Sequence, residues 1–375
     1  MNFYRRARGA AVLCGLGFLL LNVAVLAQEA ELNRAENGAG QELRDGSHDF
    51  DFNFGVWHTH ITRVLNPLTG ADRTMVLDGT VTVRRIWGGR AQLEEIEADG
   101  PKGHWEGLTL FLYNLKAHQW SQTFIASKSG ELAAPTVGEF KDGRGELYAN
   151  DTFDGRTIVV RGVWSDIKPD SHSYTESYSV DGGATWHPAF IAKLTREKQS
   201  GDAGADPVGN DARIESHDFD FDLGTWKTHS TRMLHPLTGS NDWVTMDGYS
   251  VVKKVWGGKA DLAEYTANGS AGKVTLMALR WYNPQAREWN IEFATPRVGV
   301  LGAVPGVGGM RDGRMTFYDV EPYNGRQIMV RFEIWPTGKD TTESEQAFSD
   351  DGGKTWEVNW KNTYERVSSV PGEAN

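Results

Sequence analysis

Charged side chains recur at matching positions in two halves of the chain, and these residues are the best suited to chemistry. Glu95 corresponds to Glu264, and Arg161 corresponds to Arg331. Glu95 lies two residues after Leu93, and Glu264 lies two residues after Leu262. In an extended segment, residues two apart point to the same face, so each acid shares a strand face with a leucine. A carboxylate facing the interior of a β-structure would be desolvated unless an arginine paired with it, and either effect shifts its pKa. These residues are therefore candidate polar anchors of a ligand pocket. The alternative interpretation is an outward-facing acid, or a buried Glu–Arg pair with a structural role.

Two histidines in the first half also share a strand face. His58 and His60 are two positions apart, which is the spacing for half of a metal or haem site. In the second half Lys227 replaces the first histidine and His229 the second, and no third ligand is evident. We therefore predict no metal or cofactor, with metal or haem binding through His58 and His60 as an alternative. His60 and His229 join the candidate ligand-binding residues.

Two segments fit the Asp-box pattern of sialidase-type propellers, Ser-x-Asp-x-Gly-x-Thr-Trp. They are Ser179–Trp186 and Ser349–Trp356, and they lie 170 residues apart (349 − 179). A propeller repeats its blade roughly every 40–50 residues, so we interpret both boxes as structural turns. The sequence also lacks a phosphate-binding loop, a nucleophile elbow and a zinc-protease helix motif. No catalytic residues are therefore assigned, and enzymatic activity is left undecided.

The elements that would position these residues come in two copies. His48–Phe52 recurs as His217–Phe221, an offset of 169 residues (217 − 48). The offset is 170 residues by Asp142–Arg144, which recurs as Asp312–Arg314, so one residue was gained in between. A period this long indicates duplication of a whole domain rather than a short structural repeat.

The ends and the junction differ in composition from the two copies. Arg5, Arg6 and Arg8 precede an apolar run and a small residue, Ala27, which is the pattern of a cleaved secretory signal. This segment contains the single cysteine, so the exported chain would have no disulfide. The predicted division is a signal peptide at 1–27, a polar leader at 28–46, domain 1 at 47–196, a flexible linker at 197–214, domain 2 at 215–367 and a tail at 368–375.

Each copy has the pattern of a β-protein. Segments such as Val81–Trp87 and Leu108–Tyr113 alternate or are rich in β-formers, and pairs such as Asp154-Gly155 mark the turns between such segments. Eight to ten short strands at this spacing are typical of a sandwich or a closed up-and-down barrel. We predict an all-β fold of two tandem antiparallel barrels.

The copies resemble the lipocalin-like barrels of the calycin superfamily. Gly55-Val56-Trp57 and Gly224-Thr225-Trp226 match the Gly-x-Trp signature of the first strand in that superfamily, and Arg196 and Arg366 stand near the end of each copy. The resemblance implies that each arginine stacks on the tryptophan of its copy, Trp57 or Trp226, and closes the barrel base. Such a contact contributes roughly 0.5–2 kcal/mol.

The longer pattern His-Asp-Phe-Asp-Phe-x-x-Gly-x-Trp, with a late Asp-Gly-Gly-x-Thr-Trp, is similar to a bacterial lipocalin-like domain family of unknown function. It implies a fold and no reaction. Nitrobindins, which are lipocalin-like haem proteins, use a late axial histidine. The late His172 and His187 have no counterpart in copy 2.

Charge and composition restrict the partners. The formal charge of −11 argues against nucleic-acid binding, and no membrane anchor is expected once the signal is cleaved. We predict an exported, periplasmic or extracellular monomer in which the two barrels imitate a dimer. One or both barrel interiors would bind a small, mainly apolar or aromatic molecule.

Two alternatives stay open. One is a calycin-like isomerase, cyclase or hydrolase that uses an interior carboxylate, and the other is a structural or interaction module. The copies diverge at Glu176 against Gln346 and at Tyr178 against Phe348, so we expect them to be functionally unequal.

Overall fold

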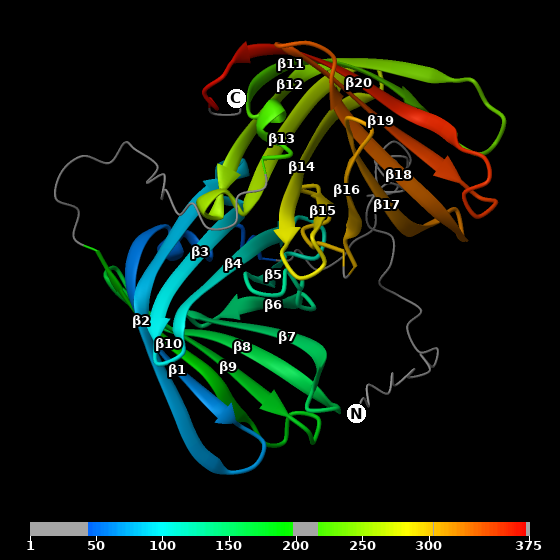
Figure 1. Ribbon diagram of the computed structural model, residues 1–375. Helices are drawn as coiled ribbons and strands as arrows, with labels where there is room; N and C mark the ends of the chain where they lie inside the picture. Colours follow the sequence, from blue (N-terminus) through cyan, green and yellow to red (C-terminus); the bar gives the residue numbers. More distant parts are fainter. Residues whose placement is uncertain (1–43, 198–216, 303, 373–375) are drawn as a thin grey trace, which may run out of the picture.

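The computed structural model describes residues 44–197, 217–302 and 304–372, which form two closed antiparallel β-barrels (Figure 1). The predicted signal peptide, nearly all of the leader and linker, and the last three residues of the tail lie outside the described residues. In each barrel every strand pairs with its neighbours in sequence, and the last strand pairs with the first. The predicted fold class, two tandem antiparallel barrels, is confirmed.

Barrel 1 contains ten strands and two short 3-10 helices. The helices are η1 (Asp51–Asn53) and η2 (Trp87–Gly89). The strands are β1 (Gly55–Asn66), β2 (Ala71–Ile86), β3 (Ala91–Gly100), β4 (Gly103–Asn114), β5 (Gln119–Ala126), β6 (Thr136–Lys141), β7 (Arg144–Phe153), β8 (Arg156–Lys168), β9 (Ser171–Ser179) and β10 (His187–Arg196).

Barrel 2 repeats this order. Its helices are η3 (Asp220–Asp222) and η4 (Trp256–Gly258). Its strands are β11 (Gly224–Met233), β12 (Trp243–Val255), β13 (Ala260–Gly269), β14 (Gly272–Asn283), β15 (Glu288–Ala294), β16 (Gly306–Arg311), β17 (Arg314–Tyr323), β18 (Arg326–Pro336), β19 (Thr341–Ser349) and β20 (Glu357–Ser368).

A phenylalanine of the repeated His-Asp-Phe-Asp-Phe motif fills the base of each barrel. Phe50 is fully buried, and its ring lies 4.8–5.8 Å from five other aromatic rings. In barrel 2, Phe219 packs against Trp289 and Phe317. The 3-10 turn that follows this phenylalanine therefore acts as a plug, because it carries an aromatic side chain into the end of the barrel.

The arginine–tryptophan contacts expected from the resemblance are present at both bases. Arg196 lies 4.0 Å from the ring of Trp57, and Arg366 lies 4.0 Å from the ring of Trp226. Arg196 also donates hydrogen bonds to the carbonyl oxygens of Phe52 and Phe54. The arginine thus ties the plug to both the first and the last strand of the barrel.

The two barrels pack against each other through the outer faces of β3 and β4 on one side and β13 and β14 on the other (Figure 1). A single apolar cluster crosses this contact; it includes Leu93 and Leu110 from barrel 1 and Leu262 and Leu279 from barrel 2. The Trp281 indole N–H donates to the Gly130 carbonyl at 2.9 Å, across the same contact. These strands are therefore buried on both faces, like the strands of a two-layer core.

Candidate functional site

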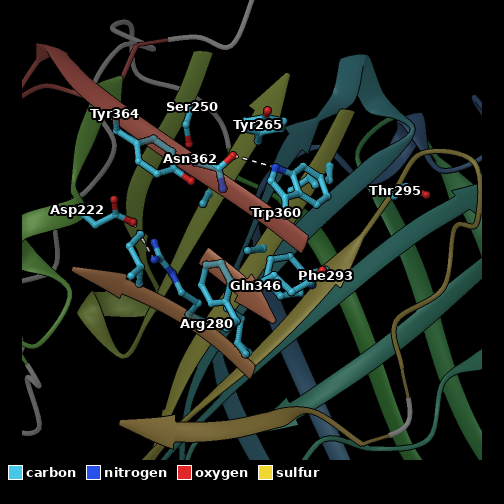
Figure 2. Close-up of a pocket in the computed structure, with 16 residues that line it drawn as sticks. Asp222, Ser250, Tyr265, Arg280, Phe293, Thr295, Gln346, Trp360, Asn362 and Tyr364 are labelled. Carbon is cyan, nitrogen blue, oxygen red and sulfur yellow. Dashed lines mark hydrogen bonds and ion pairs between the residues drawn. The ribbon is translucent and has the colours of Figure 1, made fainter. Parts of the chain in front are cut away.

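The interior of barrel 2 contains a cavity of about 100 Å³, here called the barrel 2 cavity (Figure 2). Figure 2 shows Asp222 and Arg280 together on one side of it and Thr295 on the opposite side. The strands that line it come from most of the barrel. Its lining residues are Asp222, Ser250, Ala263, Tyr265, Leu276, Ala278, Arg280, Ile291, Phe293, Thr295, Phe332, Ile334, Gln346, Trp360, Asn362 and Tyr364.

The cavity separates two apolar clusters of the barrel 2 core. Ala278, Ile291 and Ile334 belong to one cluster, whereas Tyr265 and Trp360 belong to another, and all of them line the cavity. Small-molecule sites typically combine such an apolar wall with a few polar groups. At about 100 Å³ the space is smaller than the cavity of about 150 Å³ known to bind benzene, so it suits a small molecule or the end of a larger one.

A buried arginine between two aspartates lies at the base of the cavity, which Arg280 and Asp222 line. Arg280, Asp222 and Asp261 are each at most 3% exposed. Arg280 Nη1 donates to Asp222 Oδ2 at 2.7 Å, and its Nε donates to Asp261 Oδ1. The guanidinium also lies 4.0 Å from the ring of Phe219, so the basal phenylalanine holds it in place. A charge buried this deeply requires these partners.

The triad has one guanidinium group and two carboxyl groups, and the pKa values of all three groups are raised. Burial raises the pKa of Asp261 to about 7 despite the opposing effect of Arg280. Burial also raises the pKa of Asp222. The pKa of Arg280 is raised, because the aspartates outweigh the effect of burial. Burial thus favours the neutral form of each aspartate, and Arg280 favours the charged form.

Three polar atoms of the cavity lining have no hydrogen-bond partner among the described residues. They are Arg280 Nη2, Gln346 Oε1 and Thr295 Oγ1. Their side chains are at least nine-tenths buried, with exposures of 2% for Arg280 and 9% for the other two. A buried polar atom without a partner costs about 1–3 kcal/mol. An occupant of the cavity could satisfy these atoms.

A second polar wall, formed by Tyr265, Asn362 and Tyr364, has its hydrogen bonds satisfied within the barrel. Tyr265 and Ser230 hydrogen-bond at 2.7 Å, and Ser230 donates to Asn362 Oδ1 at 2.6 Å. Asn362 Nδ2 in turn donates to Ser344, which bonds to the Tyr364 hydroxyl. Burial raises the pKa of Tyr265 and of Tyr364, so both phenols stay protonated. This network shapes the wall and leaves recognition to the three atoms without partners.

The corresponding part of the barrel 1 interior is occupied by larger side chains. Trp164 takes the place of Ile334, Phe111 the place of Arg280, and both belong to one continuous aromatic and aliphatic cluster. Trp164 is 2% exposed and lies 5.4 Å from Phe50. The two barrels therefore share a frame and differ in what fills it.

A second hollow, of about 250 Å³, lies at the edge of barrel 1. Its charged lining residues, Arg63, Lys102, His104 and Lys128, are all exposed, and Met75, Leu77 and Trp105 of the barrel 1 core also line it. His104 already faces Asp99 and Glu106, each at 3.1 Å. Its charged groups are exposed, and none of its described lining residues has a buried side-chain polar atom without a partner, so we regard the barrel 2 cavity as the candidate site.

The prediction that Glu95 and Glu264 point into the barrel interiors is wrong. Glu95 forms an ion pair with Arg84 and accepts a hydrogen bond from the Trp256 backbone N–H of the other barrel at 3.1 Å. Glu264 pairs with Lys253 at 3.4 Å. Each acid does share a face with a leucine, but that face is the outside of the barrel, which is buried by the other barrel. The alternative of a structural ion pair describes the observed geometry.

The other candidate ligand-binding residues also lie on outer faces. Arg161 and Arg331 stack over Trp186 and Trp356 at 4.1 and 5.0 Å. These tryptophans belong to the Asp-box segments. His60 pairs with the exposed Asp78 at 2.6 Å, because the buried alternate positions of β1 belong to Trp57, Thr59 and Ile61.

His229 repeats this arrangement in barrel 2, where it pairs with Asp247 at 2.8 Å. The structure therefore brings together none of the six side chains in a cavity. Within the described residues, no group of three or more His, Asp or Glu side chains is placed to hold a metal ion.

The Asp-box segments form hairpin turns at the ends of β9 and β19. Asp181 accepts hydrogen bonds from the Ser179 hydroxyl and from the Thr185 backbone and hydroxyl. Asp351 does the same with Ser349 and Thr355. The hydrogen bonds from threonine hold the pKa of Asp181 well below its usual range, which suits a turn-forming carboxylate rather than a proton donor.

Arg280, Asp222 and Asp261 were missed by the sequence analysis, and Gln346 was noted only as a difference between the copies. One signal was available for Arg280. It is the single charged residue in the apolar segment Val274–Tyr282, where copy 1 has Phe111. A lone charge within such a strand requires a buried partner.

Comparisons with known proteins are limited. The model of the BNR/Asp-box repeat matches residues 347–358, and no curated protein matches. An S-type phycobiliprotein lyase from Guillardia theta has 12% identity and a TM-score of 0.29, covering 43% of this chain and 98% of its own. A protein of unknown function from the DUF3598 family of Nostoc punctiforme has 12% identity and a TM-score of 0.23, covering 87% of this chain and 100% of its own.

Transferrin binding protein B from Neisseria meningitidis has 5% identity and a TM-score of 0.20, covering 83% of this chain and 76% of its own. Likenesses this low carry no inference about function. Among the described residues, no helix has the length and apolar character needed to cross a membrane.

Proposed function

We propose that this protein is a lipocalin-like binding protein in which barrel 2 holds a small, mainly apolar molecule and barrel 1 is a packed structural partner. The observation that carries this proposal is the barrel 2 cavity with a buried arginine at its base, whose Nη2 has no partner among the described residues. Leaving such a donor unsatisfied is costly, and an occupant of the cavity would remove that cost.

The unequal filling of the two barrels supports this division of roles. At position 334 barrel 2 has isoleucine where barrel 1 has Trp164, and at position 263 it has alanine where barrel 1 has Glu94. At these two positions, barrel 1 has large side chains in the space that is open in barrel 2. The barrel that keeps a cavity gives up packing energy, which is typical of a binding site.

The cavity can be closed with the chain's own alternative residue. The variant Ile334→Trp introduces into barrel 2 the side chain that fills barrel 1. We expect a ligand-observed NMR screen of small apolar and amphipathic fragments to detect binders of the full-length protein. The same fragments should lose at least about tenfold in affinity in the variant, because its indole occupies the space.

The matched control is Val320→Trp, which adds an indole to the outer surface of barrel 2, where Val320 is 61% exposed. This control should bind like the unmodified protein. Thermal unfolding of all three proteins shows whether Ile334→Trp folds, and Ala263→Leu is a smaller filling change if it does not. Fragments that bind equally well to the filled and unfilled barrels would contradict the proposal.

A further inference from the structure

The charge of the triad limits what the barrel 2 cavity can accept. Arg280 is already in contact with Asp222 and Asp261, so its single positive charge is fully countered. Two further cations act on these carboxylates, Arg366 on Asp222 and Lys254 on Asp261. Both have acidic partners of their own, Asp340 at 3.3 Å and Asp220 at 2.8 Å. A carboxylate entering the cavity would therefore meet a site that is neutral or negative.

The free hydrogen-bonding groups are nevertheless specific. Arg280 Nη2 can only donate, and Gln346 Oε1 can only accept. The Thr295 hydroxyl can do either, so it adds no constraint. Gln346 also lines the two smaller hollows of barrel 2, of about 20 and 10 Å³, and so lies where these spaces meet the main cavity.

From these contacts we infer that the ligand of the barrel 2 cavity is an uncharged molecule with two polar groups. An oxygen acceptor of the carbonyl type meets Arg280, and an N–H or O–H group meets Gln346. Primary amides, ureas, lactams and hydroxyketones have this combination, and simple carboxylates and amines do not. This inference rests on the proposed function, because it names the class of molecule that the same cavity takes.

A series of probes with one carbon skeleton tests the charge preference. Isobutyramide, isobutyrate and isobutylamine differ only in the polar group and are neutral, anionic and cationic at pH 7.5. Binding to the full-length protein can be followed by the indole N–H resonance of Trp360, which lines the cavity. We expect isobutyramide to bind at least about tenfold more tightly than the two ions, since each ion leaves a charge uncompensated.

The chain supplies the residues for a charge-reversal control. At the positions of Asp222 and Asp261 barrel 1 has Asn53 and Gln92. In the double variant, Asp222→Asn keeps the side-chain shape, Asp261→Gln adds one methylene group, and Arg280 loses both of its charged partners. Isobutyrate should then become the tightest of the three probes, with a gain of about tenfold or more relative to isobutyramide.

A second variant tests Gln346 if the double variant does not fold. Gln346→Met removes the acceptor and keeps a similar length. In the unmodified protein isobutyramide should bind more tightly than 3-methyl-2-butanone, a ketone of the same shape without an N–H group. In Gln346→Met the two should bind equally.

The outcomes separate the two proposals. If isobutyrate binds the unmodified protein in the cavity as tightly as isobutyramide, the ligand class is wrong and the binding function stands. An amide that keeps its advantage over the ketone in Gln346→Met would also overturn the ligand class. If no probe shifts the Trp360 resonance, both the ligand class and the binding function are overturned.

Discussion

Glu94 shows how much one position in the barrel interior can change between the copies. It faces the interior of barrel 1, is 4% exposed, and has neutral hydrogen-bonding partners, Asn53 and Thr109. Burial raises the pKa of Glu94 to about 7. The residue at this position in barrel 2 is Ala263, which lines the cavity. Copy 1 thus keeps a titratable group in a packed interior, and copy 2 keeps open space there.

This difference predicts a pH dependence of stability. Folded Glu94 holds its proton up to about pH 7, whereas the unfolded side chain loses it near its ordinary value of 4.5. The folded state therefore binds more protons at this site in this window, so the contribution of Glu94 to stability falls as the pH rises from about 4.5 to about 7. The variant Glu94→Gln should reduce that loss, by on the order of 3 kcal/mol.

Denaturant unfolding at pH 5 and pH 8 measures this effect. The control is Glu97→Gln, on the exposed outer face of the same strand. It should leave the pH dependence of the unfolding free energy unchanged. An identical pH slope in Glu94→Gln and in the unmodified protein would show that Glu94 is ionised in the folded barrel.

At the scale of the element, β14 has two buried faces with different surroundings. Leu279 is fully buried in the contact between the barrels, whereas Leu276 lines the barrel 2 cavity. The alternation of β3 and β13 was read correctly from the sequence, as was the pairing of each glutamate with a leucine on one face. Which of the two faces looks inward was not, because both faces are buried and both mix polar with apolar residues: Glu94 and Asp261 face inward, whereas Leu93 and Leu262 face the other barrel.

The two faces of β14 should respond differently to the loss of side-chain volume. Leu279→Ala creates a new cavity in a dense contact and should cost about 2–5 kcal/mol of unfolding free energy. Leu276→Ala should cost less, since its side chain already borders empty space on one side. Chemical denaturation of the two variants compares them directly, and equal losses would show that the cavity is occupied or collapsed in solution.

At the scale of the whole molecule, the apolar cluster between the barrels joins them into one unit. The cluster draws on β3 and β4 of barrel 1 and on β13 and β14 of barrel 2, and hydrogen bonds such as Ser121 to the Gly299 carbonyl at 2.8 Å cross it. An interface of this composition resembles the contact of an obligate dimer. Separation of the barrels would expose it to water.

Expression of the halves separately tests this. Residues 44–197 and 217–372 should each self-associate, because each exposes its share of the apolar cluster. Mixing the two should yield a one-to-one complex, measured by light scattering after gel filtration. Leu262→Lys in the second half should suppress both the self-association of that half and its complex with the first half. If both halves are monomeric and form no complex when mixed, the linker alone holds the barrels together.

The amino-acid sequence by itself determined the duplication, the all-β class and the closing contacts of Arg196 with Trp57 and Arg366 with Trp226. These features depend on local alternation, turn residues and motifs that repeat in both copies. The tertiary structure decided which residues form the candidate site. Alternation separates two strand faces but does not say which is interior when packing between domains buries both, so Glu95 and Glu264 were placed inside. The cavity depends on the summed volumes of side chains from many strands, and no local pattern contains that sum.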